Sequence, residues 1–121
     1  MKSRLERGAD WEQSAEAFLA ERGLHLLQRN YRTRRGEIDL VMRDGETLVF
    51  VEVRYRGAGS RGSGAESVTP AKQRRITEAA RHFLSRADPH TLHPCRFDVV
   101  AIGQERGRTV MNWIRGAFEA A

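Results

Sequence analysis

The chain has 121 residues, a formal net charge of +5, 40% hydrophobic residues and 31% charged residues. This is the length and composition of one soluble globular domain. Cys95 is the only cysteine, which excludes an internal disulfide. No apolar run approaches the roughly 18 residues of a membrane span, and the charged N-terminus lacks a signal-peptide core. These features predict a cytoplasmic protein with no membrane partner.

The basic residues number 21, and all of them except Lys2 and Lys72 are arginine. Such a charge favours a polyanionic partner such as nucleic acid. An arginine excess can also reflect genome composition, so composition alone leaves both explanations open.

The first predicted element is a helix that begins at Asp10 and stops at Gly23. Asp10 can cap the helix with Gln13 as its capping-box partner, and glycine commonly ends helices. Residues 1–9 are predicted to be a flexible N-terminus, and residues 24–33 a strand. The apolar positions of the helix fall at helical spacing: Trp11, Ala15, Phe18 and Leu19.

Two strands, 37–42 and 47–54, flank Asp44-Gly45, a strong signal for a tight hairpin. A glycine-rich loop, 57–64, follows them. Thr69-Pro70 supplies a cap and a first-turn proline for a second helix, which ends at Asp88-Pro89. Two further strands are predicted at 95–102 and 109–114, before a short C-terminal helix. The pattern predicts one mixed α/β domain over residues 10–121, a central sheet flanked by helices.

Acidic side chains collect on the predicted hairpin. If Asp44-Gly45 forms the two-residue turn, Glu37 lies opposite Glu52, and Asp39 lies beside them on the same face. Like charges opposed on a sheet are destabilising, so something must offset them.

Two explanations are open for this offset. Ion pairs with Arg54 and Arg56 are one, and a divalent cation such as Mg²⁺ is the other. Glu12, on the apolar stripe of the first helix, can reach the sheet, although an acid at a helix start also suits the helix dipole. Lys72 lies in line with the buried face of the second helix, where it is either a phosphate-contacting charge or a lysine at the edge of a core.

Several of these motifs resemble those of the YraN family of small uncharacterised bacterial proteins. The resemblance covers residues 8–118 and is carried by Gly36–Leu40, Phe50–Arg56, Gly64-Ala65, Lys72-Gln73 and Cys95–Val100. The family is similar to the restriction-endonuclease-like superfamily, which includes the archaeal Holliday-junction resolvases. That superfamily has a helix glutamate, a strand aspartate and a Glu-x-Lys motif.

The resemblance implies a restriction-endonuclease-like α/β fold and a set of site residues. Glu12, Asp39 and Glu52 would be ligands of Mg²⁺ or Mn²⁺, together with the carbonyl of Val53, and Glu37 would be an outer or alternative ligand. The implied activity is metal-dependent hydrolysis of a phosphodiester, with Arg54 stabilising charge on the phosphate and Lys72 a further catalytic candidate.

Nucleic acid is the implied partner, with DNA favoured over RNA, and Arg56 and Arg61 at the glycine-rich loop are its predicted contacts. Arg54 departs from the superfamily lysine, and Trp11 stands where many relatives have glycine. The alternatives are a nucleic-acid-binding module that no longer cuts and a non-catalytic partner protein. Monomer and homodimer both remain open. Asp98 and Arg96 are predicted to form a structural ion pair.

Overall fold

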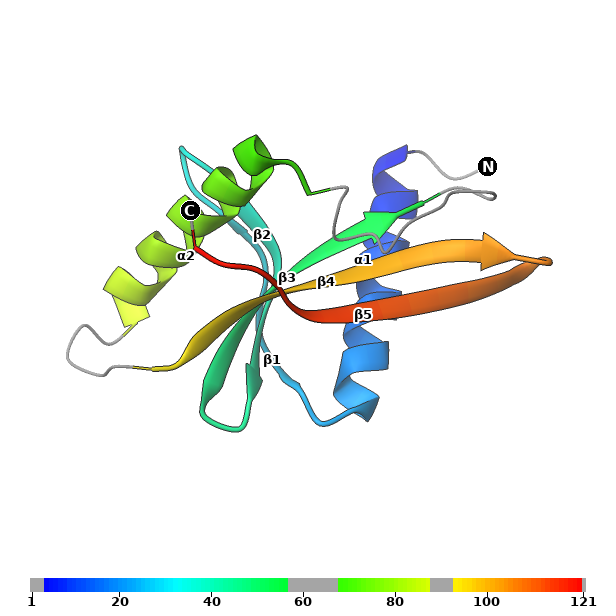
Figure 1. Cartoon of the computed structure of the whole chain (residues 1–121), viewed down its shortest axis with the longest axis horizontal. Coiled ribbons are helices and arrows are strands. Elements are labelled where there is room, and N and C mark those ends of the chain that lie inside the picture. Colours follow the sequence, from blue (N-terminus) through cyan, green and yellow to red (C-terminus); the bar gives the residue numbers. More distant parts are fainter. Residues whose placement is uncertain (1–3, 57–67, 88–92, 121) are drawn as a thin grey trace.

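The computed structural model describes residues 4–56, 68–87 and 93–120, with side chains from residue 8 onward. These residues form two helices and a five-stranded sheet (Figure 1). The elements are α1 (Arg4–Glu21), β1 (His25–Arg32), β2 (Glu37–Asp44), β3 (Thr47–Tyr55), α2 (Pro70–Ala87), β4 (Cys95–Glu105) and β5 (Arg108–Phe118). The strand order is β1-β2-β3-β4-β5, and the β3–β4 pair is parallel whereas the other pairs are antiparallel. The predicted mixed α/β fold is confirmed.

The two helices cover opposite faces of the sheet (Figure 1). Each face has its own apolar cluster, so the domain has three layers. The buried cluster under α2 contains Tyr31, Ile38, Val41, Leu48, Phe50, Val68, Ile76, Ala79, Ala80, Phe97 and Val99. The buried cluster under α1 contains Ala15, Leu19, Leu24, Leu40, Met42, Val49, Val51, Val100 and Ile102. Neither helix is long and apolar enough to cross a membrane.

Helix α1 ends where the sequence predicts but begins earlier. Gly23 has φ +96°, its N–H donates to the Ala20 carbonyl, and the Leu24 N–H donates to the Leu19 carbonyl, which is a Schellman ending. The start at Arg4 corrects the prediction that Asp10 is the cap, while the flexibility of residues 1–9 stays a prediction. Residues 4–9 are mostly good helix formers and extend the helix through Asp10.

The hairpin forms, but its register differs from the predicted one by two residues. Asp44 pairs with Thr47 and Leu40 with Val51, so the turn residues are Gly45 and Glu46. Gly45 has φ +61°, the position that glycine takes in a type II′ turn. Extending this register by one pair places Asp39, and not Glu37, opposite Glu52.

The regular alternation along β2 breaks beside Asp39, which corrects the predicted face assignment. Ile38 packs under α2, whereas Leu40 packs under α1. On the neighbouring strand Tyr31 and Arg29 pair with these two residues, and Asn30 between them has φ +50°. The left-handed conformation of Asn30 therefore accompanies a local twist, through which Ile38 and Leu40 of β2 face opposite sides of the sheet.

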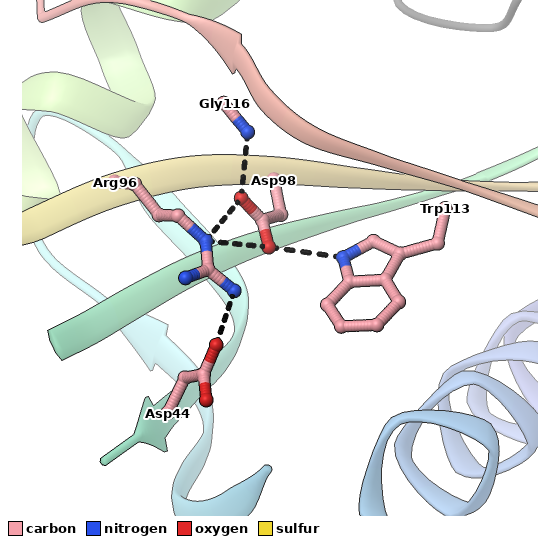
Figure 2. A network of polar contacts seen from close by, with 5 residues as sticks. All are labelled: Asp44, Arg96, Asp98, Trp113 and Gly116. Carbon is pink, nitrogen blue, oxygen red and sulfur yellow. Dashed lines mark hydrogen bonds and ion pairs between the residues drawn. The ribbon is translucent and has the colours of Figure 1, made fainter. Parts of the chain in front are cut away.

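The C-terminal segment is a strand to Phe118 and not the predicted short helix. A fully buried Asp98 holds it in place (Figure 2). The Asp98 carboxylate accepts hydrogen bonds from Trp113 Nε1 and Gly116 N, each at 2.9 Å, and from Arg96 Nε at 3.1 Å. Arg96 Nη2 also lies 2.9 Å from the Asp44 carboxylate. The predicted ion pair of Asp98 with Arg96 is confirmed, and it stabilises β5 as a strand.

Candidate functional site

The candidate site lies where β2 and β3 part. Their main-chain pairing ends at Leu40 and Val51. Beyond this last pair, the N–H of Val53 on β3 donates a hydrogen bond to Oδ2 of Asp39 on β2, at 2.8 Å. A side-chain carboxylate thus replaces the main-chain acceptor that a continuing strand pair would provide, and it is fixed at the point of divergence.

Glu52 is the buried acid of the site, with 4% of its surface exposed. Its Oε1 lies 2.7 Å from Nζ of Lys72, in the first turn of α2. The Thr69-Pro70 helix start positions this lysine, because Thr69 Oγ1 accepts the N–H of Lys72 at 3.2 Å as an N-cap. The capping signal in the sequence therefore determines which cation meets Glu52.

The carboxyl groups of Asp39 and Glu52 lie close enough for each to shift the pKa of the other. Burial, reinforced by Asp39, raises the pKa of Glu52 to about 7, and Lys72 only partly offsets this. Burial also raises the pKa of Asp39, against the opposing effect of the Val53 N–H.

Glu12 of α1 approaches Asp39 from the other layer. Burial raises its pKa to about 7, and the nearby Asp39 carboxylate adds to the shift while Arg32 opposes it. Its Oε1 is buried and has no hydrogen-bond partner among the described residues. A buried carboxylate oxygen without a partner is costly, so this atom is suited to a ligand or an ion.

The donor set fits Mg²⁺ or Mn²⁺ by its chemistry. All three acids offer oxygen, which these ions prefer, and Mg²⁺ typically takes one or two carboxylates and keeps several waters. Within the described residues, no three His, Cys, Asp or Glu side chains form a ready-made metal cage. The site is therefore an open carboxylate cluster, and Lys72 supplies its nearest positive charge.

The other predicted site residues lie around this cluster. Glu37 is exposed, 3.5 Å from Arg32 Nε, and it raises the pKa values of Glu12 and Asp39. Arg54 is partly buried and follows Glu52 by two residues on β3, so the two share a face. Arg56 is partly buried at the end of β3, and its N–H donates to the Ile102 carbonyl at 2.7 Å.

Arg61 and the loop 57–64 lie outside the described residues. The Trp11 departure has a packing explanation, because its ring stacks on Tyr55 with centroids 4.6 Å apart. Sequence reasoning missed Arg32, which neighbours both Glu37 and Glu12. The signal was present as three arginines, at positions 32, 34 and 35, around the end of the strand predicted at 24–33.

Comparison with known proteins assigns the chain to a family. The family model described as Uncharacterised protein family UPF0102 matches residues 11–102. The chain belongs to the UPF0102 family. This assignment confirms the resemblance to the YraN family that the motifs indicate.

Relatives of the UPF0102 family match almost from end to end. A UPF0102 protein of Nitrosococcus oceani is 51% identical over 113 residues, 93% of this chain and 91% of the relative. One from Nitrosomonas eutropha is 50% identical over 119 residues, 98% of each chain. One from Pseudomonas savastanoi pv. phaseolicola is 48% identical over 119 residues, 98% of this chain and 97% of the relative. The chain thus corresponds to nearly the full length of these relatives.

Proposed function

We propose that this protein is a metal-dependent nuclease that hydrolyses phosphodiester bonds in nucleic acid, with DNA the favoured substrate. The observation that carries the proposal is the cluster of Glu12, Asp39 and Glu52. These acids come from α1, β2 and β3, and burial raises the pKa of each. A divalent cation would offset the cost of keeping them ionised together.

The sequence resemblance points the same way. A helix glutamate, a strand aspartate and a glutamate on the next strand form the pattern of the restriction-endonuclease-like superfamily, and here they correspond to Glu12, Asp39 and Glu52. Asp39 and Glu52, which belong to different strands, lie near each other, and Glu12 lies near Asp39. The partnerless Glu12 Oε1 is a second, independent support for an ion at this place.

In this mechanism Asp39, Glu52 and the Val53 carbonyl would hold Mg²⁺ or Mn²⁺, and Glu12 would complete the donor set. When bound, the ion supplies Lewis-acid polarisation of the phosphate and lowers the pKa of a water. Arg54 stabilises negative charge that develops on the phosphate, and its planar fork suits that role. Lys72, which lies 2.7 Å from Glu52, would be available to contact a phosphate oxygen or a water if Glu52 held the ion. Glu37 acts outside the donor set, as a neighbouring negative charge.

A nucleic-acid-binding module that does not cut is the second candidate function. Arg54 favours it, because arginine stays protonated in proteins and cannot act as a general base. Proton acceptance in a cleaving enzyme would then fall to Glu37, to Lys72 or to a water at the ion. Binding and cleavage must therefore be measured separately.

The test is a titration with Mg²⁺ or Mn²⁺ in the presence of labelled single-stranded, duplex and four-way-junction DNA. We expect the wild type to cleave at least one substrate, and Asp39→Asn and Glu52→Gln to abolish cleavage. Glu46→Gln is the matched control, since Glu46 is an exposed acid in the turn of the same hairpin. If the wild type binds DNA but does not cleave it with either ion present, the nuclease proposal is refuted and the binding-module proposal takes its place.

A further inference from the structure

A second concave surface lies beside the turn that joins β1 to β2. It is a cavity of about 830 Å³ between this turn and α2, and it lies apart from the three clustered acids. Its lining includes Arg32, Thr33, Arg34 and Arg35 from the turn and Glu78 and Arg81 from α2. We call it the arginine cavity.

The arginine cavity has an excess of positive charge. Four arginines and one glutamate line it. Arg81 lies 3.3 Å from Glu78, and Arg32 lies near Glu37. Arg34 and Arg35 are exposed, and no carboxylate of the described residues pairs with either of them. Two adjacent guanidinium groups without an acid are ready to bind an anion.

The turn that carries these arginines is fixed in shape. Thr33 Oγ1 accepts the N–H groups of Arg35 and Gly36 at 3.2 and 3.1 Å, and the Thr33 N–H donates to the Gly36 carbonyl at 2.8 Å. Gly36 packs so tightly on α2 that a Cβ there would lie 1.8 Å from the Arg75 carbonyl oxygen. The arginine main chain is therefore held before any ligand arrives, which lowers the cost of binding.

The lining also indicates the class of ligand. The charged side chains that line it are four guanidinium groups and one carboxylate, and His82 and Ser85 add further polar groups. An excess of guanidinium groups suits a polyanionic ligand.

Arg32 links the arginine cavity to the carboxylate cluster. Arg32 lines the cavity and is also close enough to Glu12 to lower the pKa of that acid. A smaller cavity of about 250 Å³ is lined by Glu37, Lys72 and Arg75, among others, and Glu37 contacts Arg32. Arg32 and Glu37 thus connect the arginine cavity to the smaller cavity, which Lys72 also lines.

We infer that the arginine cavity binds the phosphodiester backbone of a nucleic acid strand, next to the phosphate that lies at Glu12, Asp39 and Glu52. The inference rests on the proposed function for its ligand and adds where the strand lies. Arg34 and Arg35 contact backbone phosphates through their guanidinium groups. Such contacts fix the position of the strand and read no sequence.

The test measures the affinity of the full chain for labelled duplex and four-way-junction DNA by fluorescence anisotropy, in EDTA and at several salt concentrations. For Arg34→Ala/Arg35→Ala we expect a Kd at least tenfold higher on every sequence. We also expect the slope of log K against log salt to fall by about 0.9 for each lost phosphate contact. Arg43→Ala/Arg108→Ala, which removes the same charge from two exposed positions elsewhere, is expected to change Kd by less than about threefold. Equal effects of the two double variants would overturn the inference.

A charge-preserving variant separates electrostatics from misfolding. Arg34→Lys/Arg35→Lys keeps both charges but loses the forks, so we expect it to retain the salt slope with a smaller loss of affinity. If its slope falls as far as that of the alanine pair, the contacts are not with phosphates. Circular dichroism of each variant shows whether the fold is intact.

Cleavage in Mg²⁺ is scored separately. A wild type that binds DNA without cutting it refutes the nuclease while the arginine variants still test the cavity. A wild type that cuts, with unchanged affinity in the Arg34→Ala/Arg35→Ala variant, overturns the inference alone. A wild type that binds no DNA or RNA overturns the inference.

Discussion

Lys72 Nζ lies 2.7 Å from Glu52 Oε1 and thereby links the start of α2 to β3. The pKa of Glu52 nevertheless rises to about 7, because burial and the Asp39 carboxylate outweigh the attraction of the lysine. The pair is therefore not a fully compensated ion pair near neutral pH. One lysine serves two buried acids, and an additional cation would complete the balance of charge.

The first prediction concerns Lys72→Met. Without the ammonium group, the pKa of Glu52 should rise further, because the charge and the hydrogen bond of Lys72 stabilise the ionised form of Glu52. We expect metal-dependent cleavage to fall by about tenfold or more, roughly 1.4 kcal/mol in the barrier. Arg74→Met, which removes an exposed cation from the same helix, is the control and should leave the rate nearly unchanged. Equal rates in the two variants would exclude a role for Lys72 at the site.

The second prediction concerns the pH dependence of stability in the metal-free protein. The folded-state pKa values of Glu12 and Glu52 lie near 7, above the ordinary value of 4.5. The folded state thus binds more protons than the unfolded state between these values, so stability must fall as pH rises from about 4.5 to about 7. Thermal unfolding in EDTA should show a lower Tm at pH 8 than at pH 5.

Glu52→Gln tests the cause of that slope. It removes an acid that is costly to ionise, so the slope should flatten. At pH 8 the variant should exceed the wild type by on the order of 1 kcal/mol, a Tm rise of about 4 °C. Added Mg²⁺ should stabilise the wild type more at pH 8 than at pH 5, because ligand carboxylates must be ionised. A Tm independent of pH in both proteins would contradict the charge balance described for Glu52.

Local chemistry made much of the fold predictable. The Thr69-Pro70 start, the Gly23 stop and the alternating runs of β2 and β3 each use interactions within a few residues. The hairpin register was harder, because Asp44-Gly45 suits a turn with either residue at its first position, and the structure uses Gly45 there. A two-residue shift preserves which face a side chain takes, so the acids stay together although Asp39 replaces Glu37 opposite Glu52.

Long-range contacts explain the features that the sequence did not predict. The C-terminal segment is a strand because Gly116 and Trp113 donate to Asp98, more than ten residues earlier in the chain. The break in β2 beside Asp39 accompanies the left-handed conformation of Asn30 on the neighbouring strand. The arginine cavity likewise forms only when the β1–β2 turn packs on α2 through Gly36. None of these contacts has a local signature.

The third prediction addresses Arg54. If its role is to stabilise charge on the phosphate, Arg54→Lys should retain most of the cleavage rate, since lysine keeps the positive charge. Arg54→Met should lower the rate by about tenfold to a hundredfold, because the charge is lost. Single-turnover cleavage rates of the two variants provide the measurement. A larger loss in Arg54→Lys than in Arg54→Met would argue against an electrostatic role.

The last prediction separates stability from function at Asp98. Its carboxylate is fully buried and accepts from Arg96, Trp113 and Gly116 (Figure 2). Asp98→Asn keeps the shape but removes the charge that compensates Arg96, and breaking a buried pair typically costs about 3–5 kcal/mol. Asp44, 2.9 Å from Arg96, retains part of the compensation. We therefore expect a loss of about 2–3 kcal/mol in the free energy of unfolding, measured by urea titration. Trp113→Phe, which removes one hydrogen bond to a charged group, should cost less, about 1.5 kcal/mol.

Below its melting temperature Asp98→Asn should bind metal and nucleic acid as the wild type does, since Asp98 and the groups that donate to it lie on β4 and β5, whereas the clustered acids lie on α1, β2 and β3. A folded Asp98→Asn protein that no longer binds either would show that the network also shapes the site.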